Sequence, residues 1–296
     1  MTSRVSKFKD DQTRDRYAEA YDRTLAASGV ELLQHDVPTS FGPTHVIEAG
    51  DASFPPVVLL HSFTFSSTVW VRNLAALAHH RHVYAIDLIG DMNLSRAERK
   101  LSGRDDLLVW FHEVLAKFGV TRTPVVGNSY GGWLAVSFGL VAPQTVSRIA
   151  LISPVAFTRL RLKFWLHALP ASIAKSPRRA EQMARWYLNP GAFDEPASRL
   201  WLDQFARGWP AFRSVFGTLP IPRPFDDQEL RSLSVPVLLI EGADEPIHDS
   251  QAAIRRASAL VPSISTKLLP DIKHVAELEC PDVVNTLLVE FLAEEN

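Results

Sequence analysis

A serine held between glycines is the residue of this chain best suited to act as a nucleophile. The segment Gly127-Asn128-Ser129-Tyr130-Gly131 follows a short apolar run, 124–126, and precedes an apolar, helix-like stretch that begins at Trp133. Between a strand and a helix, this pattern places the serine on a sharp turn and requires small residues two positions to either side. The N-terminal end of the helix also favours the negative charge that develops during acyl transfer. We therefore predict that Ser129 attacks a carbonyl carbon; the alternative is a glycine-rich turn in which the serine is incidental.

A serine hydroxyl alone is weakly nucleophilic, so the site also needs a base and an acid that orients the base. After a serine turn of this type, the acid and then the histidine follow along the chain. Two adjacent acids, Asp244 and Glu245, come after the apolar run 235–240, and His274 comes after the last strand-like run. His248 is the main rival base because it lies nearer to the acids in sequence. His274 is the predicted general base because it ends a later strand and precedes the C-terminal helix.

The elements that must position these residues are short strands that alternate with helices. Five of the strand-like runs, all but 265–269, are continuously hydrophobic rather than alternating, which is typical of parallel strands buried on both faces. This alternation predicts a doubly wound α/β domain with a mostly parallel sheet, in which ligands bind beyond the carboxyl ends of the strands. The segment before Gly29 has the spacing of a further helix, which could pack on the sheet or on an inserted cap. The predicted strands are 57–60, 82–86, 124–126, 149–152, 235–240 and 265–269.

The alternation stops between 155 and 232, which we interpret as a helical cap inserted into a core made of 1–154 and 233–296. This segment holds 12 of the 28 aromatic residues, and its 12 Lys and Arg against 7 Asp and Glu give it a charge of +5. The rest of the chain has 19 Lys and Arg against 26 Asp and Glu, a charge of −7. So many aromatic side chains predict an apolar cavity over Ser129. The cap residues expected to line it are Phe157, Trp186 and Trp209.

From about Thr44 to the C-terminus, the chain contains a series of motifs that match those of one known family. They include Leu59-Leu60-His61 after a strand, the serine turn, the loop at Gly242, and His274. With them, the chain resembles serine esterases of the α/β-hydrolase fold and, among these, bacterial carboxylesterases of the naproxen-esterase type. Those esterases carry a D-x-x-G-D-x-N-x-S stretch. Its counterparts here are Asp87, Gly90, Asp91, Asn93 and Ser95.

The resemblance implies further roles for residues of this chain. The esterases use a glutamate three residues after the loop glycine as the acid, which is Glu245 when counted from Gly242. Asp244 falls one position short, and it is the alternative acid. The resemblance also implies an oxyanion hole formed by the backbone N–H groups of Phe63 and Tyr130, two residues that would then lie beside the substrate.

The chain departs from the family pattern next to the predicted oxyanion hole. The residue after His61 is usually glycine, but here it is Ser62. Glycine at this position allows a positive φ or a close backbone approach, so the serine puts the geometry of the hole in doubt. We expect His61 to brace the loop through hydrogen bonds rather than to transfer a proton.

Composition excludes several classes of function. The net charge of −2 provides no general attraction for nucleic acid, and the single cysteine excludes an internal disulfide framework. No apolar stretch approaches the roughly 20 residues that a membrane span requires. The first twenty residues have no apolar core typical of a signal peptide, which predicts a cytoplasmic protein.

The function predicted from these residues is that of a serine carboxylesterase. It would hydrolyse esters of hydrophobic or aryl-bearing acids through an acyl-enzyme intermediate, without a metal or organic cofactor. The expected partners are a small-molecule ester and water, with a homodimer left open. One alternative is a different hydrolase on the same scaffold, such as a C–C bond hydrolase, a lactonase or a perhydrolase. The other is a non-hydrolytic protein of this fold that binds or cyclises its ligand.

Overall fold

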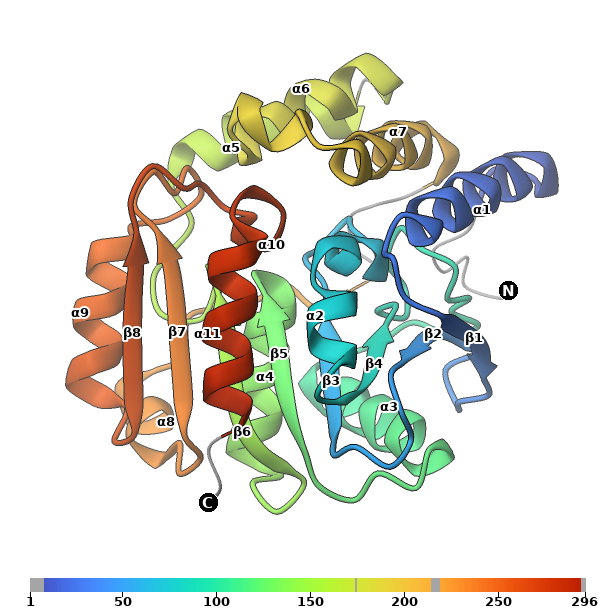
Figure 1. Cartoon of the computed structure of the whole chain (residues 1–296). Coiled ribbons are helices and arrows are strands. Elements are labelled where there is room, and N and C mark those ends of the chain that lie inside the picture. Colours follow the sequence, from blue (N-terminus) through green and yellow to red (C-terminus); the bar gives the residue numbers. More distant parts are fainter. Residues whose placement is uncertain (1–7, 174, 214–218, 294–296) are drawn as a thin grey trace.

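The computed structural model of the chain describes residues 8–173, 175–213 and 219–293. The strands are β1 (Leu32–Val37), β2 (Thr44–Ala49), β3 (Pro56–Leu60), β4 (His82–Ile86), β5 (Thr123–Asn128), β6 (Val146–Ile152), β7 (Val237–Gly242) and β8 (Ile264–Leu269). They form one eight-stranded sheet in the order β1-β2-β4-β3-β5-β6-β7-β8 (Figure 1). Strands β3 to β8 are parallel, whereas β2 pairs antiparallel with β1 and β4. The predicted α/β fold with a mostly parallel sheet is therefore confirmed.

The six predicted strands are β3 to β8, and the sequence analysis did not find β1 or β2. Strand β1 lies at the edge of the sheet, and most of its side chains are partly or fully exposed. It therefore has no continuous apolar run. In β2, His45 and Glu48 interrupt the apolar residues, and Glu48 accepts hydrogen bonds from His35 and His82, both at 2.6 Å.

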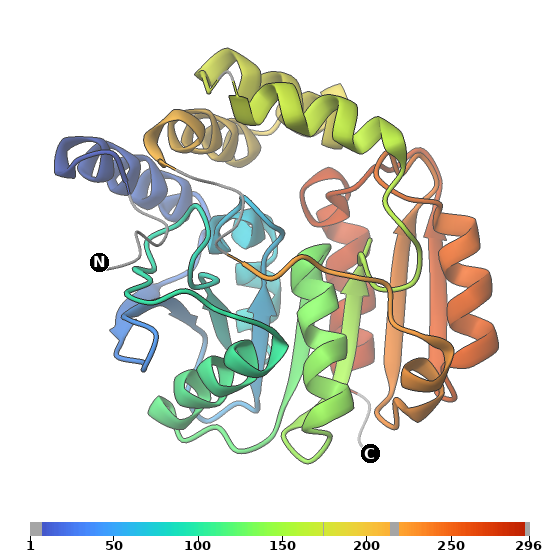
Figure 2. The same cartoon turned by 180° about the vertical axis from the view of Figure 1, so that it is seen from behind.

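Helices cover both faces of the sheet. Those outside the cap are α1 (Asp11–Ala26), η1 (Ser67–Arg72), α2 (Leu74–Ala78), α3 (Arg104–Lys117), α4 (Tyr130–Val141), α8 (Asp227–Ser232), α9 (Ser250–Leu260), α10 (Ala276–Glu279) and α11 (Pro281–Ala293). Helices α2 and α11 lie in front of the sheet in Figure 1, and α3 and α4 lie in front in Figure 2. Along β3, Val57 and Leu59 pack into one buried cluster and Val58 and Leu60 into the other. Strand β3 thus supplies both hydrophobic layers, which explains why its sequence is apolar throughout.

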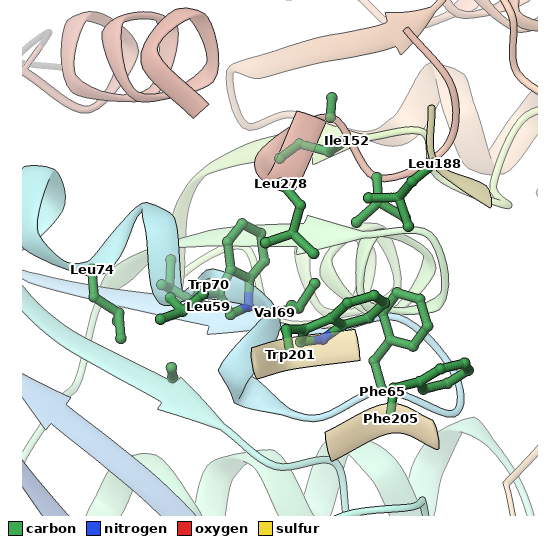
Figure 3. Close-up of a cluster of buried hydrophobic side chains, with 14 of the residues drawn as sticks. Leu59, Phe65, Val69, Trp70, Leu74, Ile152, Leu188, Trp201, Phe205 and Leu278 are labelled. Atoms are coloured by element: carbon green, nitrogen blue, oxygen red, sulfur yellow. The ribbon is translucent and has the colours of Figure 1, made fainter. Parts of the chain in front are cut away.

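The first helices after β6 arch over the carboxyl ends of the strands (Figures 1 and 2). They are α5 (Leu162–Ile173), α6 (Pro177–Tyr187), η2 (Pro190–Phe193) and α7 (Pro196–Ala211). Aromatic packing joins them to the core: Trp201 stacks on Phe205 with ring centres 5.4 Å apart, and Phe65 meets both rings edge-on (Figure 3). The predicted cap interval 155–232 also contains α8, which contacts α9. The limits of the cap remain a prediction.

Helix α1 packs on cap helix α7 and on η1. The hydroxyl of Tyr17 donates to the carbonyl of Met92 at 2.9 Å and accepts from the side chain of Gln204 at 3.1 Å. The sequence left open whether the N-terminal helix packs on the sheet or on the cap. The structure places it against the cap. Within the described part of the chain, no helix combines the length and the apolar character needed to cross a bilayer.

Candidate active site

Ser129 occupies a tight turn between β5 and α4. Its φ of +51° lies in the left-handed region, which an L-residue adopts at a cost. The chain comes so close to itself here that a Cβ on Gly127 would lie 2.3 Å from the carbonyl oxygen of Gly131, and one on Gly131 would lie 2.2 Å from that of Leu60. These contacts explain why both flanking positions are glycine. The turn holds the serine at the N-terminus of α4, where a helix favours developing negative charge.

The base and the acid meet beyond the ends of β8 and β7. Nδ1 of His274 lies 2.7 Å from Oε2 of Glu245, and Oε1 of Glu245 accepts the backbone N–H of Ile247 at 2.8 Å. His274 and Glu245 are both buried, whereas Asp244 is exposed. Because an ionised carboxylate can only accept hydrogen bonds, Nδ1 of His274 carries the hydrogen, and Nε2 remains to take up a proton.

Electrostatics keeps the Glu245 carboxylate ionised. Burial alone would raise the pKa of Glu245, but the positive charges of His274 and His248 and the hydrogen bonds from His274 and Ile247 lower the pKa to about 2. The acid therefore remains negatively charged throughout the neutral range. A charged carboxylate in this position can stabilise the imidazolium that forms when His274 takes a proton.

The loop that carries His274 is held from several sides. A Cβ on Gly242 would lie 2.3 Å from the carbonyl oxygens of Ile272 and Lys273, so the glycine lets this loop pass directly over the end of β7. The backbone N–H of His274 donates to the carbonyl of Tyr187 in α6 at 3.0 Å. The side chain of Asn128, next to the serine, donates to the carbonyl of His274 at 3.2 Å. Core and cap together thus position the base.

Phe63 and Tyr130 line the same cavity as Ser129 and His274. Positive φ values among the described non-glycine residues occur at Thr64, Ser129, Ser153 and Asp271, but not at Ser62. The serine that replaces the usual glycine therefore fits without backbone strain. The strained residue of this turn is Thr64, with φ of +69°.

The aspartate-rich stretch after β4 braces this turn. The N–H of Thr64 donates to both carboxylate oxygens of Asp91, at 3.0 and 2.9 Å. Asp91 is buried, and burial raises its pKa to about 8, although the amides of Met92 and Thr64 oppose the shift. Asp87 accepts the N–H of Ser67 at 2.7 Å. The side chains of Asp91 and Asp87 thus anchor both ends of the segment that follows Phe63.

His61 lies beneath the turn as a neutral hydrogen-bonding residue. Its Nδ1 donates to the carbonyl of Ser62 at 2.7 Å, and its Nε2 accepts the N–H of Leu88 at 2.8 Å. Burial lowers the pKa of His61, which favours the neutral ring. His61 is absent from the lining of the cavity among the described residues. It connects the ends of β3 and β4, in agreement with the bracing role expected from the sequence.

The cavity above Ser129 has a volume of about 400 Å³ and is lined mainly by apolar side chains. Of the predicted pocket residues, Phe63, Tyr130 and Trp209 line it, and Phe157 and Trp186 do not. Phe157 is 1% exposed and packs in the core with α3, α4 and α9. Trp186 instead stacks on His167 of α5, with ring centres 4.3 Å apart. Phe164, Trp165 and Tyr187, which belong to the aromatic residues of the cap but were not predicted individually, also line it. The lining residues that the sequence analysis missed include Phe65, Leu160, Leu169, Met183 and Ile247.

A second buried acid–histidine pair adjoins the Glu245–His274 pair. Nε2 of His248 lies 3.0 Å from Oε2 of Glu241, and the rings of His248 and His274 are 6.4 Å apart. Burial opposes a charge on His248, but Glu241 and Glu245 outweigh it and raise the pKa of His248 to about 9. Of the two histidines, His274 lines the cavity that contains Ser129, and His248 is absent from that lining among the described residues. Glu241, an acid within an otherwise apolar strand, was the sequence signal for this pair.

The described residues contain one group with the donors to hold a metal ion, namely Glu245, His248 and His274, whose ligand atoms lie within 4.8 Å of one another. The same atoms take part in the hydrogen bonds of the two acid–histidine pairs. A metal here would compete with the bond that orients His274. This arrangement suits proton transfer better than metal binding.

The chain belongs to the alpha/beta hydrolase family, whose sequence profile matches residues 57–287. Its relatives include two proteins of Bacillus subtilis (strain 168). An uncharacterized carboxylesterase, nap, is 33% identical over 95% of this chain and 93% of the relative. The carboxylesterase YbfK is 34% identical over 94% of this chain and 93% of the relative.

Solved structures agree with this family membership. The crystal structure of naproxen esterase from Bacillus subtilis has a TM-score of 0.87 and 33% identity, covering 94% of this chain and 98% of the other. The crystal structure of carboxylesterase YbfK has a TM-score of 0.87 and 31% identity, covering 96% and 100%. The predicted resemblance to carboxylesterases of the naproxen-esterase type is confirmed.

Proposed function

We propose that this protein is a serine carboxylesterase that hydrolyses esters of hydrophobic or aryl-bearing acids through an acyl-enzyme intermediate. The observation that carries the proposal is the buried Glu245–His274 pair, whose histidine lines one apolar cavity together with a serine on a strained turn. The carboxylesterase names of the relatives support the same activity.

In the first half of the reaction, the Oγ of Ser129 attacks the ester carbonyl carbon while Nε2 of His274 takes the hydroxyl proton. Glu245 stabilises the imidazolium through its bond to Nδ1. The N–H groups of Phe63 and Tyr130 would hold the oxyanion of the tetrahedral intermediate. The intermediate collapses when the bond to the leaving alcohol breaks, and His274 gives its proton to that alcohol.

In the second half, water replaces the alcohol. His274 takes a proton from water as the water oxygen attacks the acyl carbon, and a second tetrahedral intermediate forms. The bond between the acyl carbon and Ser129 then breaks, and His274 returns the proton to the serine oxygen. The products are the free acid and the enzyme in its starting state.

The lining of the cavity indicates the substrate class. No Asp, Glu, Lys or Arg side chain is among the described residues that line it. A charged acyl group would therefore lose its hydration without gaining a partner, which costs several kcal/mol. Uncharged aliphatic or aryl groups fit this surface. The same argument disfavours the alternative of a C–C bond hydrolase acting on a substrate with a carboxylate, such as a dienoate, because none of the described lining residues is a Lys or Arg that could pair with that carboxylate.

An organophosphonate probe tests the serine chemistry directly. We expect it to label wild type with loss of activity, and to leave Ser129→Ala unlabelled while that variant remains folded by circular dichroism. Wild type should hydrolyse p-nitrophenyl esters, and Ser129→Ala should lose roughly 10,000-fold or more in kcat. A folded wild type without labelling would favour a ligand-binding protein. Labelling with negligible turnover of esters would favour another hydrolase.

A homodimer and a cytoplasmic location stay predictions from the sequence. Light scattering coupled to gel filtration tests the first, and fractionation of cells that express the protein tests the second.

A further inference from the structure

Helix α5 exposes an apolar face on the outside of the cap. The exposed fractions are 73% for Leu162, 64% for Leu166, 50% for Leu169 and 36% for Trp165. These four residues occupy positions i, i+4, i+7 and i+3 and therefore share one side of the helix. Contiguous exposed apolar side chains of this kind mark interaction surfaces rather than ordinary protein surface.

This face is continuous with the mouth of the active-site cavity. Trp165 and Leu169 line the cavity that contains Ser129, and so does Ile221, which is 85% exposed. Helix α5 is an outer element of the arch over the strand ends (Figures 1 and 2). A surface bound to α5 would therefore meet the cavity entrance as well.

The segment around this face carries a strong positive charge. Residues 159–187 contain seven Lys and Arg against one acid, Glu181, which gives a charge of +6. Six of the seven basic residues are exposed, and Lys175 is the partly buried one. The exposed basic residues are Arg159, Arg161, Lys163, Arg178, Arg179 and Arg185. An exposed apolar helix face within a strongly basic segment is typical of helices that lie in the interface of an anionic membrane.

We propose that the α5 face, defined by Leu162, Trp165, Leu166, Leu169 and Ile221, docks on an anionic phospholipid surface with the cavity mouth turned toward the lipid. A second copy of the chain is the less favourable occupant, because a two-fold contact through α5 would bring two segments of charge +6 together. Anionic headgroups satisfy that charge while the leucines enter the acyl layer. Apolar esters dissolved in the lipid could then reach Ser129 without crossing water. This route of supply rests on the proposed esterase function, whereas docking itself does not.

Sedimentation of the full chain with vesicles tests the docking. We expect wild type to bind vesicles of phosphatidylcholine mixed with phosphatidylglycerol, to bind pure phosphatidylcholine at least tenfold more weakly, and to be released by salt. Leu162→Ser/Leu166→Ser should reduce binding to the mixed vesicles at least tenfold. The matched control is Leu33→Ser/Val141→Ser, which alters side chains of similar exposure in β1 and α4 and should bind like wild type.

The charge is tested in the same assay. Arg178→Glu/Arg179→Glu should weaken binding, whereas Arg122→Glu/Arg231→Glu should not, because those two exposed arginines precede β5 and β7 at the opposite end of the sheet. Equal binding by all variants, or no binding by wild type, would overturn the proposal. A dimer that Leu162→Ser/Leu166→Ser abolishes, without lipid binding, would assign the face to a second copy.

Activity on a soluble ester separates this proposal from the proposed function. Leu162 and Leu166 do not line the cavity, so their double variant should hydrolyse p-nitrophenyl acetate like wild type. Hydrolysis without vesicle binding would remove the docking proposal and leave the esterase. If wild type bound vesicles but hydrolysed no ester, the proposed esterase function would be removed and the docking proposal would remain.

Discussion

The strand-end loops and the cap helices enclose one cavity, but different forces hold them. In the loops, Glu245, His274, Asp91 and His61 are buried polar groups with hydrogen-bond partners at fixed distances. The cap in addition packs aromatic rings against one another, as in the stack of Trp201 on Phe205. Directional bonds fix atoms to within a few tenths of an ångström, whereas apolar packing constrains shape and volume. We therefore expect changes in the loops to affect reaction rate and changes in the cap to affect the choice of substrate.

Removal of the acid in the loops should have the largest effect. Glu245→Gln puts an amide opposite Nδ1 of His274 and removes the charge that stabilises the imidazolium, so kcat should fall roughly 1,000- to 10,000-fold. Asp244→Asn changes the exposed neighbour and should alter kcat less than about threefold. Steady-state kinetics with one p-nitrophenyl ester measures both variants. The reverse ranking would mean that Asp244 orients the histidine.

The sequence was informative for the loops because of how parallel strands are built. Strands buried on both faces have to be apolar throughout, so the residue types that end each run are conspicuous, and parallel strands bring those ends to one edge. The structure accordingly brings Ser129, Glu245 and His274 to the same edge of the sheet. Only the family resemblance distinguished Glu245 from Asp244. Residue types alone cannot show which of two adjacent acids in a loop contacts the histidine.

The cavity-lining residues of the cap were harder to predict, because the sequence of an apolar helix does not show which of its side chains face the cavity. Phe157 and Phe164 are both aromatic residues near the start of the insertion, yet only Phe164 lines the cavity. No local pattern separates them, since the difference arises from how α5 sits over the core. The exposed edge strand β1 was missed for a related reason: one strand with few buried side chains produces no apolar run.

Asp91 tests whether the turn beneath the cavity needs a directional brace. Asp91→Asn weakens the hold on the N–H of Thr64, next to the predicted oxyanion donor Phe63. A displaced donor should lower kcat roughly 10- to 100-fold, less than the loss of a donor, while KM changes little. Kinetics together with thermal melting separates this effect from unfolding.

The control for Asp91 is Asp226→Asn, which changes the capping carboxylate of α8 outside the cavity lining. It should lower the melting temperature slightly and leave kcat unchanged. If Asp91→Asn lowered only the melting temperature, the carboxylate would be a structural residue without influence on the reaction.

His248 tests the second acid–histidine pair through stability rather than rate. The pKa of His248 is raised from 6.5 to about 9 in the folded protein, so its stabilising effect is complete below about pH 6.5 and is lost as the pH rises through about 9. The pH-dependent part amounts to roughly 3 kcal/mol. The double variant Glu241→Gln/His248→Asn should therefore flatten the decline of the unfolding free energy between these pH values, as urea denaturation would measure. His248→Asn alone would leave the buried Glu241 carboxyl to hold the proton.

Groups away from this pair contribute to that decline in wild type and in the double variant alike. Burial also raises the pKa values of Asp91, Glu277 and Glu279, to about 8, 8 and 7, so only the difference between wild type and the double variant reports on the Glu241–His248 pair. His112→Asn, at an exposed position in α3, should retain the wild-type slope. An unchanged slope in Glu241→Gln/His248→Asn would mean that the Glu241–His248 pair does not hold an additional proton.

Two tryptophans of α7 provide the finest test of the comparison, because one lines the cavity and the other does not. Trp209→Phe enlarges the cavity, so the ratio of kcat/KM for an aryl-bearing ester to that for an acetyl ester should rise roughly three- to tenfold. Trp201→Phe instead removes part of the contact with Phe65 and Phe205 that joins cap to core. It should lower the melting temperature and leave the ratio within about twofold of wild type. Equal shifts of the ratio in both variants would mean that the cap selects substrates through its overall packing, and not through the side chains that touch the acyl group.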